Sequence, residues 1–199
     1  MVLGSLIVVN HIRKSYNRLT NEDVETIIDQ IAPTWAQRIA DIFHDGKIGG
    51  FLYEEEFWKI HELDKDEDRS QFVNGGNMLD SNDIDEMVRR IENEDNGSKK
   101  GLVLWFHSHF IAILKIDEKE NGSSYEIINT LCFKDEQGAR RVHCKSTRSL
   151  RIALQAYANA RFSREEKETI RQMKWNEVTT WKERDPRFFH YTVWTKRIL

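Results

Sequence analysis

Two apolar segments joined by a short polar stretch constrain this chain most, because they predict a pair of adjacent antiparallel strands. The first segment runs from Trp105 to Ile116 and the second from Tyr125 to Leu131. The intervening residues, 117–124, are mostly polar and suited to a turn. Strands paired in this way hold His109, near the start of the first strand, beside Asn129, near the end of the second.

Helical patterns lie on both sides of this strand pair. Apolar spacing predicts a helix over 6–16, and capping patterns predict helix starts near Thr20, Asp80, Ser146 and Ser163. Strands are expected at 102–106, 109–116, 125–133 and 139–144, with a last one within 188–199. This order predicts an α+β fold in which N-terminal helices precede an antiparallel sheet meander and a C-terminal helical and strand extension follows.

The segment after residue 160 differs from the rest in composition. We expect a domain over residues 1–160 and an extension over 161–199, which carries ten basic and six acidic residues and the tryptophans 175, 181 and 194. Aromatic residues at this density are rarely left exposed on a monomer. The extension is therefore expected to pack on the domain or on a partner, with these tryptophans largely buried.

Composition excludes several classes of function. The chain has 199 residues, 39% hydrophobic residues and a net charge of −3, which suits a packed domain and predicts no general affinity for nucleic acid or anionic membranes. No apolar stretch approaches the roughly 20 residues of a membrane span. Two cysteines favour a reducing compartment. We expect an intracellular protein, cytoplasmic or nuclear, that binds another protein.

Two metal hypotheses follow from residue spacing. His107 and His109 share a strand face, and Cys132, His143 and Cys144 lie nearby in sequence, so a zinc-binding module is conceivable. None of these residues has the paired short spacings of a structural zinc motif. The alternating aspartates 64, 66 and 68 resemble a calcium loop, but Arg69 and Gly75 occupy its glycine and glutamate positions. No metal and no cofactor are expected.

The order of several short motifs resembles the Josephin domain, a papain-like cysteine peptidase fold that cleaves ubiquitin chains. The matching stretches span about residues 4–160 and read Val9-Asn10-His11-Ile12, Leu19-Thr20-Asn21-Glu22-Asp23-Val24 and Gly76-Asn77-Met78-Leu79-Asp80-Ser81, followed by the two strand settings and the helix over 150–157. The resemblance implies that His109 matches the catalytic base and Asn129 the amide that orients it. It also implies ubiquitin, or a larger assembly, as the protein partner.

The position of the nucleophile departs from this family. The resemblance places the nucleophilic cysteine within Gly4 to Ile7, where Ser5 is the only hydroxyl and no cysteine occurs. A serine has a much higher pKa than a thiol and stays unactivated in a site built for a thiolate. We therefore expect a non-catalytic binding or structural subunit. The alternative is a deubiquitinating cysteine peptidase whose nucleophile is missing or altered in this chain.

Overall fold

The computed structural model describes residues 2–35 without 14–17, residues 37, 41, 68–92, 99–107, 109–118, 122–129, 140–175 and 185–196. The helices are α1 (Val2–Arg13), α2 (Asn21–Thr26), the π-helical turn η1 (Ile27–Ile31), α5 (Ser81–Glu92), α6 (Thr147–Arg161) and α7 (Arg164–Gln172). The strands are β1 (Asp68–Asn77), β2 (Lys99–Phe106), β3 (His109–Glu118), β4 (Gly122–Asn129), β5 (Arg140–Cys144) and β6 (Phe188–Lys196). The chain thus combines helices with an antiparallel sheet, which confirms the α+β class.

The six strands form one sheet in the order β1-β6-β2-β3-β4-β5. All neighbouring strands are antiparallel. Strands β2 to β5 follow one another as the meander that the sequence predicts, whereas β6 inserts between β1 and β2. Residues 188–196, which we assigned to an extension after residue 160, therefore form an inner strand of the same sheet as β2 to β5.

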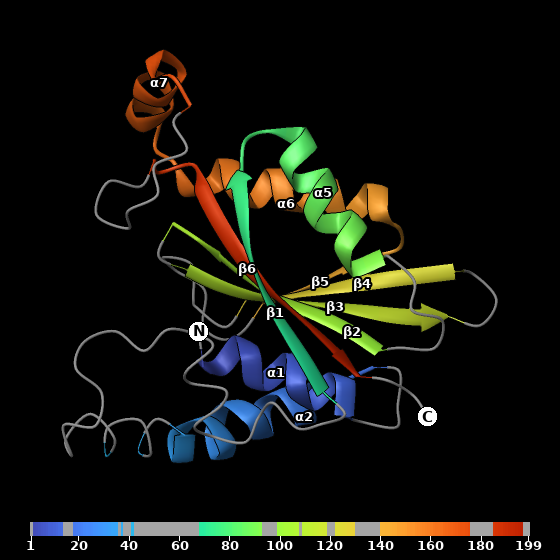
Figure 1. Cartoon of the computed structure of the whole chain (residues 1–199). Coiled ribbons are helices and arrows are strands. Elements are labelled where there is room, and N and C mark those ends of the chain that lie inside the picture. Colours follow the sequence, from blue (N-terminus) through green and yellow to red (C-terminus); the bar gives the residue numbers. More distant parts are fainter. Residues whose placement is uncertain are drawn as a thin grey trace.

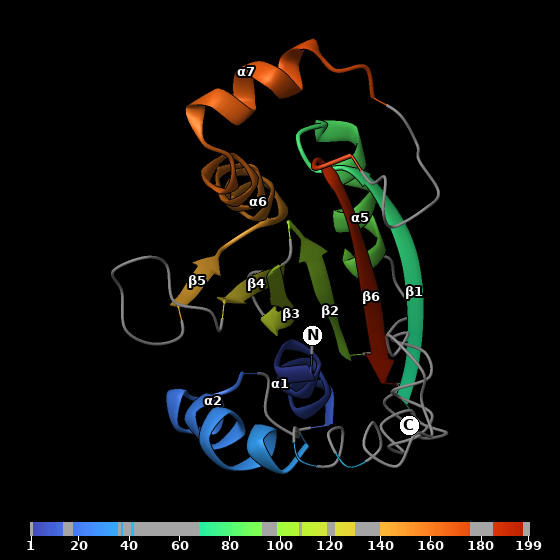
Figure 2. The same cartoon turned by 90° about the vertical axis from the view of Figure 1, so that its left-hand side faces the viewer.

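Helices cover both faces of this sheet, α5 and α6 on one side and α1 and α2 on the other (Figure 1). We call these the α6 face and the α1 face; Figure 2 shows them from the side. The α6 face is filled by apolar side chains that alternate along the strands. Its buried strand residues include Leu102, Leu104, Phe106, Ile111, Ile113, Tyr125, Ile127, Phe189 and Tyr191.

Helix α5 packs on this face through Ile84, Met87, Val88 and Ile91, each at most 1% exposed. Their spacing of three and four residues places them on one side of the helix. Helix α6 contributes Leu150, Leu154 and Ala158. Capping boxes begin α6 at Ser146 and α7 at Ser163, as the sequence predicts. Each such cap stabilises a helix end by about 1 kcal/mol.

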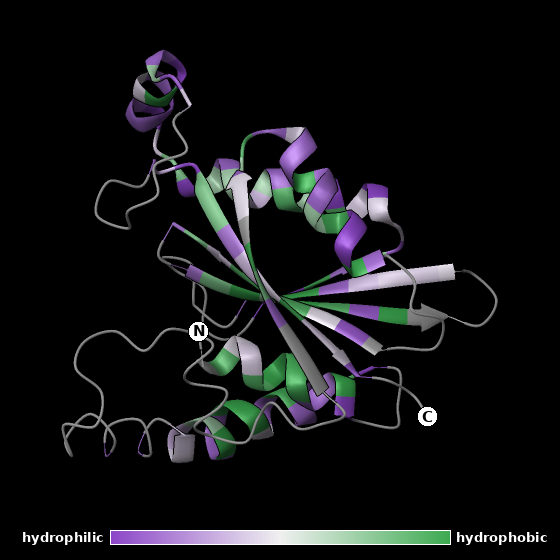
Figure 3. Cartoon of the chain, in the orientation of Figure 1, coloured by the Kyte–Doolittle hydropathy of each residue, from purple (hydrophilic) through white to green (hydrophobic). Residues whose placement is uncertain are grey.

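Helix α1 covers the other face and is buried along most of its length, and hydrophobic residues predominate along it (Figure 3). Its side chains meet Val103, Ala112, Leu114, Ile128 and Trp194 of the sheet. Nε2 of His11, which is 1% exposed, donates to the backbone oxygen of Lys115 at 2.9 Å. His11 therefore fixes the position of α1 along β3, as well as filling space.

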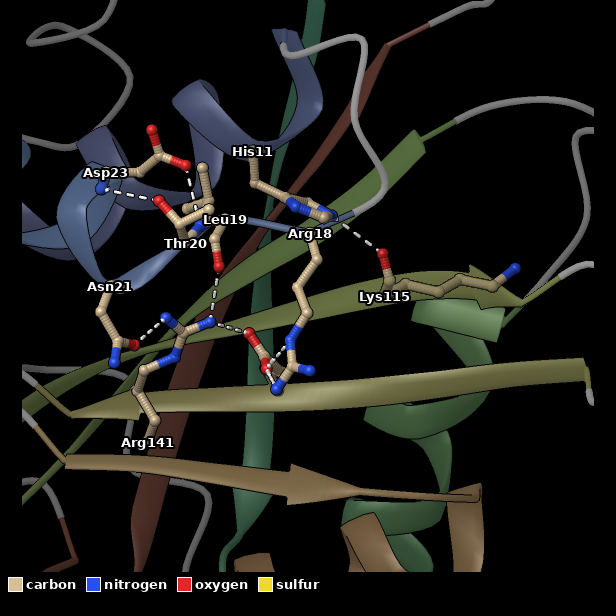
Figure 4. Close-up of polar contacts among 9 residues, drawn as sticks. His11, Arg18, Leu19, Thr20, Asn21, Asp23, Lys115 and Arg141 are labelled. Carbon is tan, nitrogen blue, oxygen red and sulfur yellow. Dashed lines mark hydrogen bonds and ion pairs between the residues drawn. The ribbon is translucent and has the colours of Figure 1, made fainter.

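Glu126, Arg18 and Arg141 form a cluster of ion pairs on the α1 face, and we call it the Glu126 cluster (Figure 4). The Glu126 side chain, 1% exposed, accepts from Nε of Arg18 and from Nη2 of Arg141, each at 2.5 Å. Arg141 also donates to the Leu19 oxygen and to Oδ1 of Asn21, both at 2.7 Å. Because Arg18 to Asn21 lead into α2, this cluster attaches α2 to strands β4 and β5.

The segment before β6 is held by a second buried pair. Nη2 of Arg187 donates to Oδ2 of Asp185 at 2.5 Å, and the Arg187 guanidinium lies 5.4 Å from the ring centre of Trp175. Trp194 is fully buried and Trp175 is partly buried, while Trp181 lies outside the described residues. In the part of the chain that the structure describes, no helix is both long and apolar enough to cross a membrane.

Strand β1 is the element that sequence patterns did not predict. The sequence predicts no strand before residue 102, yet residues 68–77, which include Gly75 and Gly76, form one strand. The two glycines coincide with an irregularity in the pairing of β1 with β6, between Asn74 and Asn77. A Cβ on Gly75 would lie 2.4 Å from the Phe189 ring, so glycine here permits the close approach of β1 and β6.

Candidate functional site

His109 begins β3 at the end of the tight connection from β2. Phe106 and His109 are the last cross-strand pair of this hairpin, and His107 between them has a φ of 51°. This left-handed conformation is uncommon for a residue with a side chain. The connection therefore fixes His107 and His109 at one end of the sheet.

The register places His109 and Asn129 on the same face of the sheet. Asn129 lies directly across from Ile111, two residues beyond His109. Side chains at alternate positions of a strand share a face, so His109, Ile111 and Asn129 all project to the α6 face. Asn129 is 6% exposed. The two residues predicted from the sequence as base and amide are thus diagonal neighbours on adjacent strands.

The imidazole of His109 accepts a hydrogen bond from an arginine. Nη1 of Arg161, the last residue of α6, lies 2.8 Å from Nε2 of His109. A guanidinium can only donate, so Nε2 is the acceptor and the neutral ring carries its proton on Nδ1. Nδ1 is buried and has no hydrogen-bond partner among the described residues, so no hydrogen bond joins His109 to Asn129.

The surroundings of His109 favour its neutral form. Burial lowers the pKa of His109 below 6.5, and the nearby Arg161 and His107 lower the pKa further. Aromatic rings pack around the same corner: Arg161 lies 4.9 Å above the Tyr157 ring, and Phe162 meets His107 edge-on at 5.1 Å. Burial also raises the pKa of Tyr157. Both side chains beside Arg161 are therefore uncharged near neutral pH.

Ser5, the residue in the predicted nucleophile position, lies in α1 and is 0% exposed. This helix covers the face of the sheet opposite to that of His109. Its Oγ has no hydrogen-bond partner within the described residues. The structure thus brings His109 and Asn129 to one face and does not join Ser5 to them by a hydrogen bond.

The thiols do not complete a nucleophilic site in the described part of the chain. Cys144 ends β5, is 2% exposed and packs in the apolar interior of the α6 face. Burial raises the pKa of this thiol, which disfavours the reactive thiolate. Cys132 lies outside the described residues, as do Asp64 and Asp66. Among the residues described, no three histidine, cysteine or acidic side chains gather as metal ligands.

Arg161 is the site residue that sequence reasoning missed. It stands 52 positions after His109, and nothing in the sequence close to either residue connects them. A signal did exist in the periodicity of α6. Arg161 follows Leu150, Leu154 and Ala158 at spacings of four, four and three, which assigns it to the buried side of that helix.

Comparisons with known proteins identify a similar fold. No family model matches the chain, and no curated protein matches it in sequence. Among solved structures, the chain is similar to the ubiquitin-specific protease encoded by a murine cytomegalovirus tegument protein, solved in complex with a ubiquitin-based suicide substrate. The TM-score is 0.52 at 7% identity, with 98% of this chain and 75% of the other covered. The arrangement of helices and sheet described above is therefore shared with a ubiquitin-specific protease at the level of the fold.

Proposed function

We propose that this protein is a degenerate, non-catalytic Josephin-like protein of papain-like fold, which acts as a binding or structural subunit through contacts with other proteins. The observation that carries the proposal is the Arg161–His109 hydrogen bond. A general base needs a lone pair directed at the group that it deprotonates. With Nε2 accepting from Arg161 and the proton on Nδ1, the imidazole of His109 has no lone pair to offer.

The proposed nucleophile position supports the same conclusion. Ser5 is the only hydroxyl within Gly4 to Ile7, and it is buried in a helix on the opposite face of the sheet. Cys144 is a buried thiol with a raised pKa. Neither residue provides the activated nucleophile that covalent catalysis requires.

The comparison supports a protein partner. The viral protease of similar fold was solved bound to a ubiquitin-based substrate, and the motifs of the present chain resemble those of ubiquitin-directed Josephin domains. We therefore propose ubiquitin, free or within a larger assembly, as the first partner to test. In this interpretation His109 and Asn129 are remnants of a catalytic pair.

The test combines reactivity with binding. The purified chain is incubated with ubiquitin carrying a C-terminal electrophile and with linkage-defined ubiquitin dimers, and isotope-labelled ubiquitin is titrated with the chain and followed by NMR. We expect no covalent adduct and no cleavage, together with localised shifts in the ubiquitin spectrum. Cleavage by the unaltered chain would show that the protein is an enzyme.

A substitution experiment separates the proposal from its alternative, an altered deubiquitinating peptidase. Ser5→Cys is prepared alone and with Arg161→Ala, which frees Nε2 of His109. We expect both variants to remain unreactive, because Ser5 and His109 lie on opposite faces. Ser81→Cys, at an exposed serine that begins α5, controls for unspecific labelling. An adduct confined to the double variant would support the alternative.

A further inference from the structure

In one continuous stretch of this chain, all of the charged residues are basic. Residues 137–164 contain seven arginine and lysine residues and no aspartate or glutamate, although the whole chain has a net charge of −3. Its described residues, 140–164, form β5, the short connection after it, α6 and the start of α7. A basic region of this size within an acidic protein creates a local positive potential.

At least three of these seven side chains are engaged in the fold. Arg141 belongs to the Glu126 cluster, Arg151 pairs with Asp85 at 2.7 Å, and Arg161 binds His109. The remaining four, Arg140, Lys145, Arg148 and Arg164, are exposed. Three of the four lie together, in β5 and around the N-terminal end of α6. Lys145 and Arg148 therefore present their charges to the solvent.

Strand β5 is an edge of the sheet. Its inner side pairs with β4, and among the strands that the structure describes none pairs with its outer side. Val142 at its centre is 39% exposed, and Arg140 and His143 are exposed as well. An edge strand with unpaired backbone groups is able to accept another strand.

The helix that follows adds charge of the same sign. The first turn of α6 contains Arg148 and no acidic residue, although acidic residues are the ones favoured at this position. Lys145 stands just before it. Basic side chains on an edge strand repel basic strands, and burying their charges makes pairing with an apolar strand costly, which limits aggregation. An acidic strand, in contrast, is attracted.

We propose that β5 and the N-terminal end of α6 form a docking surface for an extended acidic segment of a partner protein. The segment pairs with the outer edge of β5 through backbone hydrogen bonds, as in β-strand addition. An apolar residue of the segment covers Val142, and flanking carboxylates face Lys145 and Arg148. This inference builds on the proposed binding function, but it does not require that ubiquitin be the partner or that the His109 site be inactive.

The test measures binding of defined peptides to the full chain by fluorescence anisotropy. The probe is a labelled peptide in which glutamate alternates with valine. The controls are the same peptide with lysine for glutamate, a version with alternate backbone amides methylated, and a single-stranded oligonucleotide of equal charge. We expect the acidic peptide to bind at least about tenfold more tightly than each control, and more weakly at higher salt.

Charge-reversal variants locate the surface. Lys145→Glu combined with Arg148→Glu should weaken binding of the acidic peptide about tenfold. Arg164→Glu is the matched control, because it lies in the same basic stretch, is exposed and begins α7 beyond the opposite end of α6. We expect little change with this variant. Thermal unfolding confirms that all variants are folded.

Three outcomes would overturn the docking surface. Equal weakening by Arg164→Glu would mean that only overall charge matters. Tighter binding of the oligonucleotide would assign the surface to nucleic acid. Equal binding of the amide-methylated peptide would exclude strand addition. Ubiquitin cleavage, in contrast, would overturn the proposed function and leave the peptide result unchanged, so the two failures are distinguishable.

Discussion

Arginine side chains fasten this sheet to flanking segments at two places, and the two contacts differ in the group that accepts. On the α1 face, Arg18 and Arg141 donate to the buried carboxylate of Glu126. On the α6 face, Arg161 donates to the imidazole of His109. The first contact joins opposite charges, whereas the second requires that the acceptor stay neutral. The ion pairs of Glu126 are therefore suited to stabilising the fold. The Arg161–His109 hydrogen bond, in contrast, depends on pH, because it forms only while the imidazole is neutral.

The largest effect is expected from Glu126→Gln. The substitution keeps the shape of the side chain but leaves two guanidinium groups without a counter-charge, and loss of one member of a buried ion pair costs about 3 kcal/mol. Urea unfolding measures the change in the free energy of unfolding. Glu168→Gln is the control, because Glu168 pairs with Arg171 on the exposed surface of α7, where such pairs contribute about 0.5 kcal/mol. Equal losses in the two variants would contradict a special role for Glu126.

The two arginines of the Glu126 cluster should differ in importance. The Arg141 side chain is 19% exposed and the Arg18 side chain is 56% exposed. Arg141 also holds the Leu19 oxygen and Asn21. Arg141→Met should therefore cost about 2 kcal/mol and Arg18→Met about 0.5 kcal/mol in the same unfolding assay. A larger loss for Arg18→Met would reverse the assignment of Arg141 as the main anchor.

A smaller, pH-dependent effect is expected at His109. Its pKa in the folded chain is below 6.5, so the unfolded chain binds the proton more readily. The free energy of unfolding therefore includes a share from His109 that is present above about pH 6.5 and is lost as the pH falls through the folded pKa. His109→Gln removes this share. Denaturation curves between about pH 7.5 and about pH 5 should show a shallower loss of stability for the variant than for the unaltered chain.

The smallest effect on stability, but the most direct one on the site, is expected from Arg161→Met. Methionine retains apolar contacts and removes the positive charge, one of the causes that lower the pKa of His109. NMR titration of the ring protons should therefore show a higher His109 pKa in the variant. Arg164→Met, three residues further on and exposed, should leave this pKa unchanged. An unchanged His109 pKa in Arg161→Met would show that the charge of Arg161 does not lower the pKa of His109.

Local patterns predicted most of the elements, since each depends on neighbouring residues. The apolar spacing in α5, the capping boxes at Ser146 and Ser163, and the strands β2 to β5 all follow from spacings of a few residues. Strand pairing predicted that His109 and Asn129 lie side by side, but their common face follows only from the observed register, in which Ile111 lies across from Asn129. Strand β1 was missed because acidic residues precede it and two glycines lie within it, a composition that is typical of loops.

Local sequence patterns could not predict which distant segments pair or pack against each other. The insertion of β6 between β1 and β2 depends on which strand edges meet, and no short-range signal encodes that choice. The contact between Arg161 and His109 depends on how α6 docks on the sheet. Periodicity could assign Arg161 to the buried side of its helix, but the residue beneath it follows only from the packed structure.

The place of β6 in the sheet has a consequence for how the protein is made. Strand β6 is synthesised after both strands that it joins, and its partners lie about 120 residues earlier for β1 and about 90 for β2. Until β6 leaves the ribosome, β1 and β2 each present an unpaired inner edge. Pairings between segments this far apart form slowly. A nascent chain of this sequence therefore exposes these two strand edges until translation reaches β6, and exposed strand edges favour aggregation.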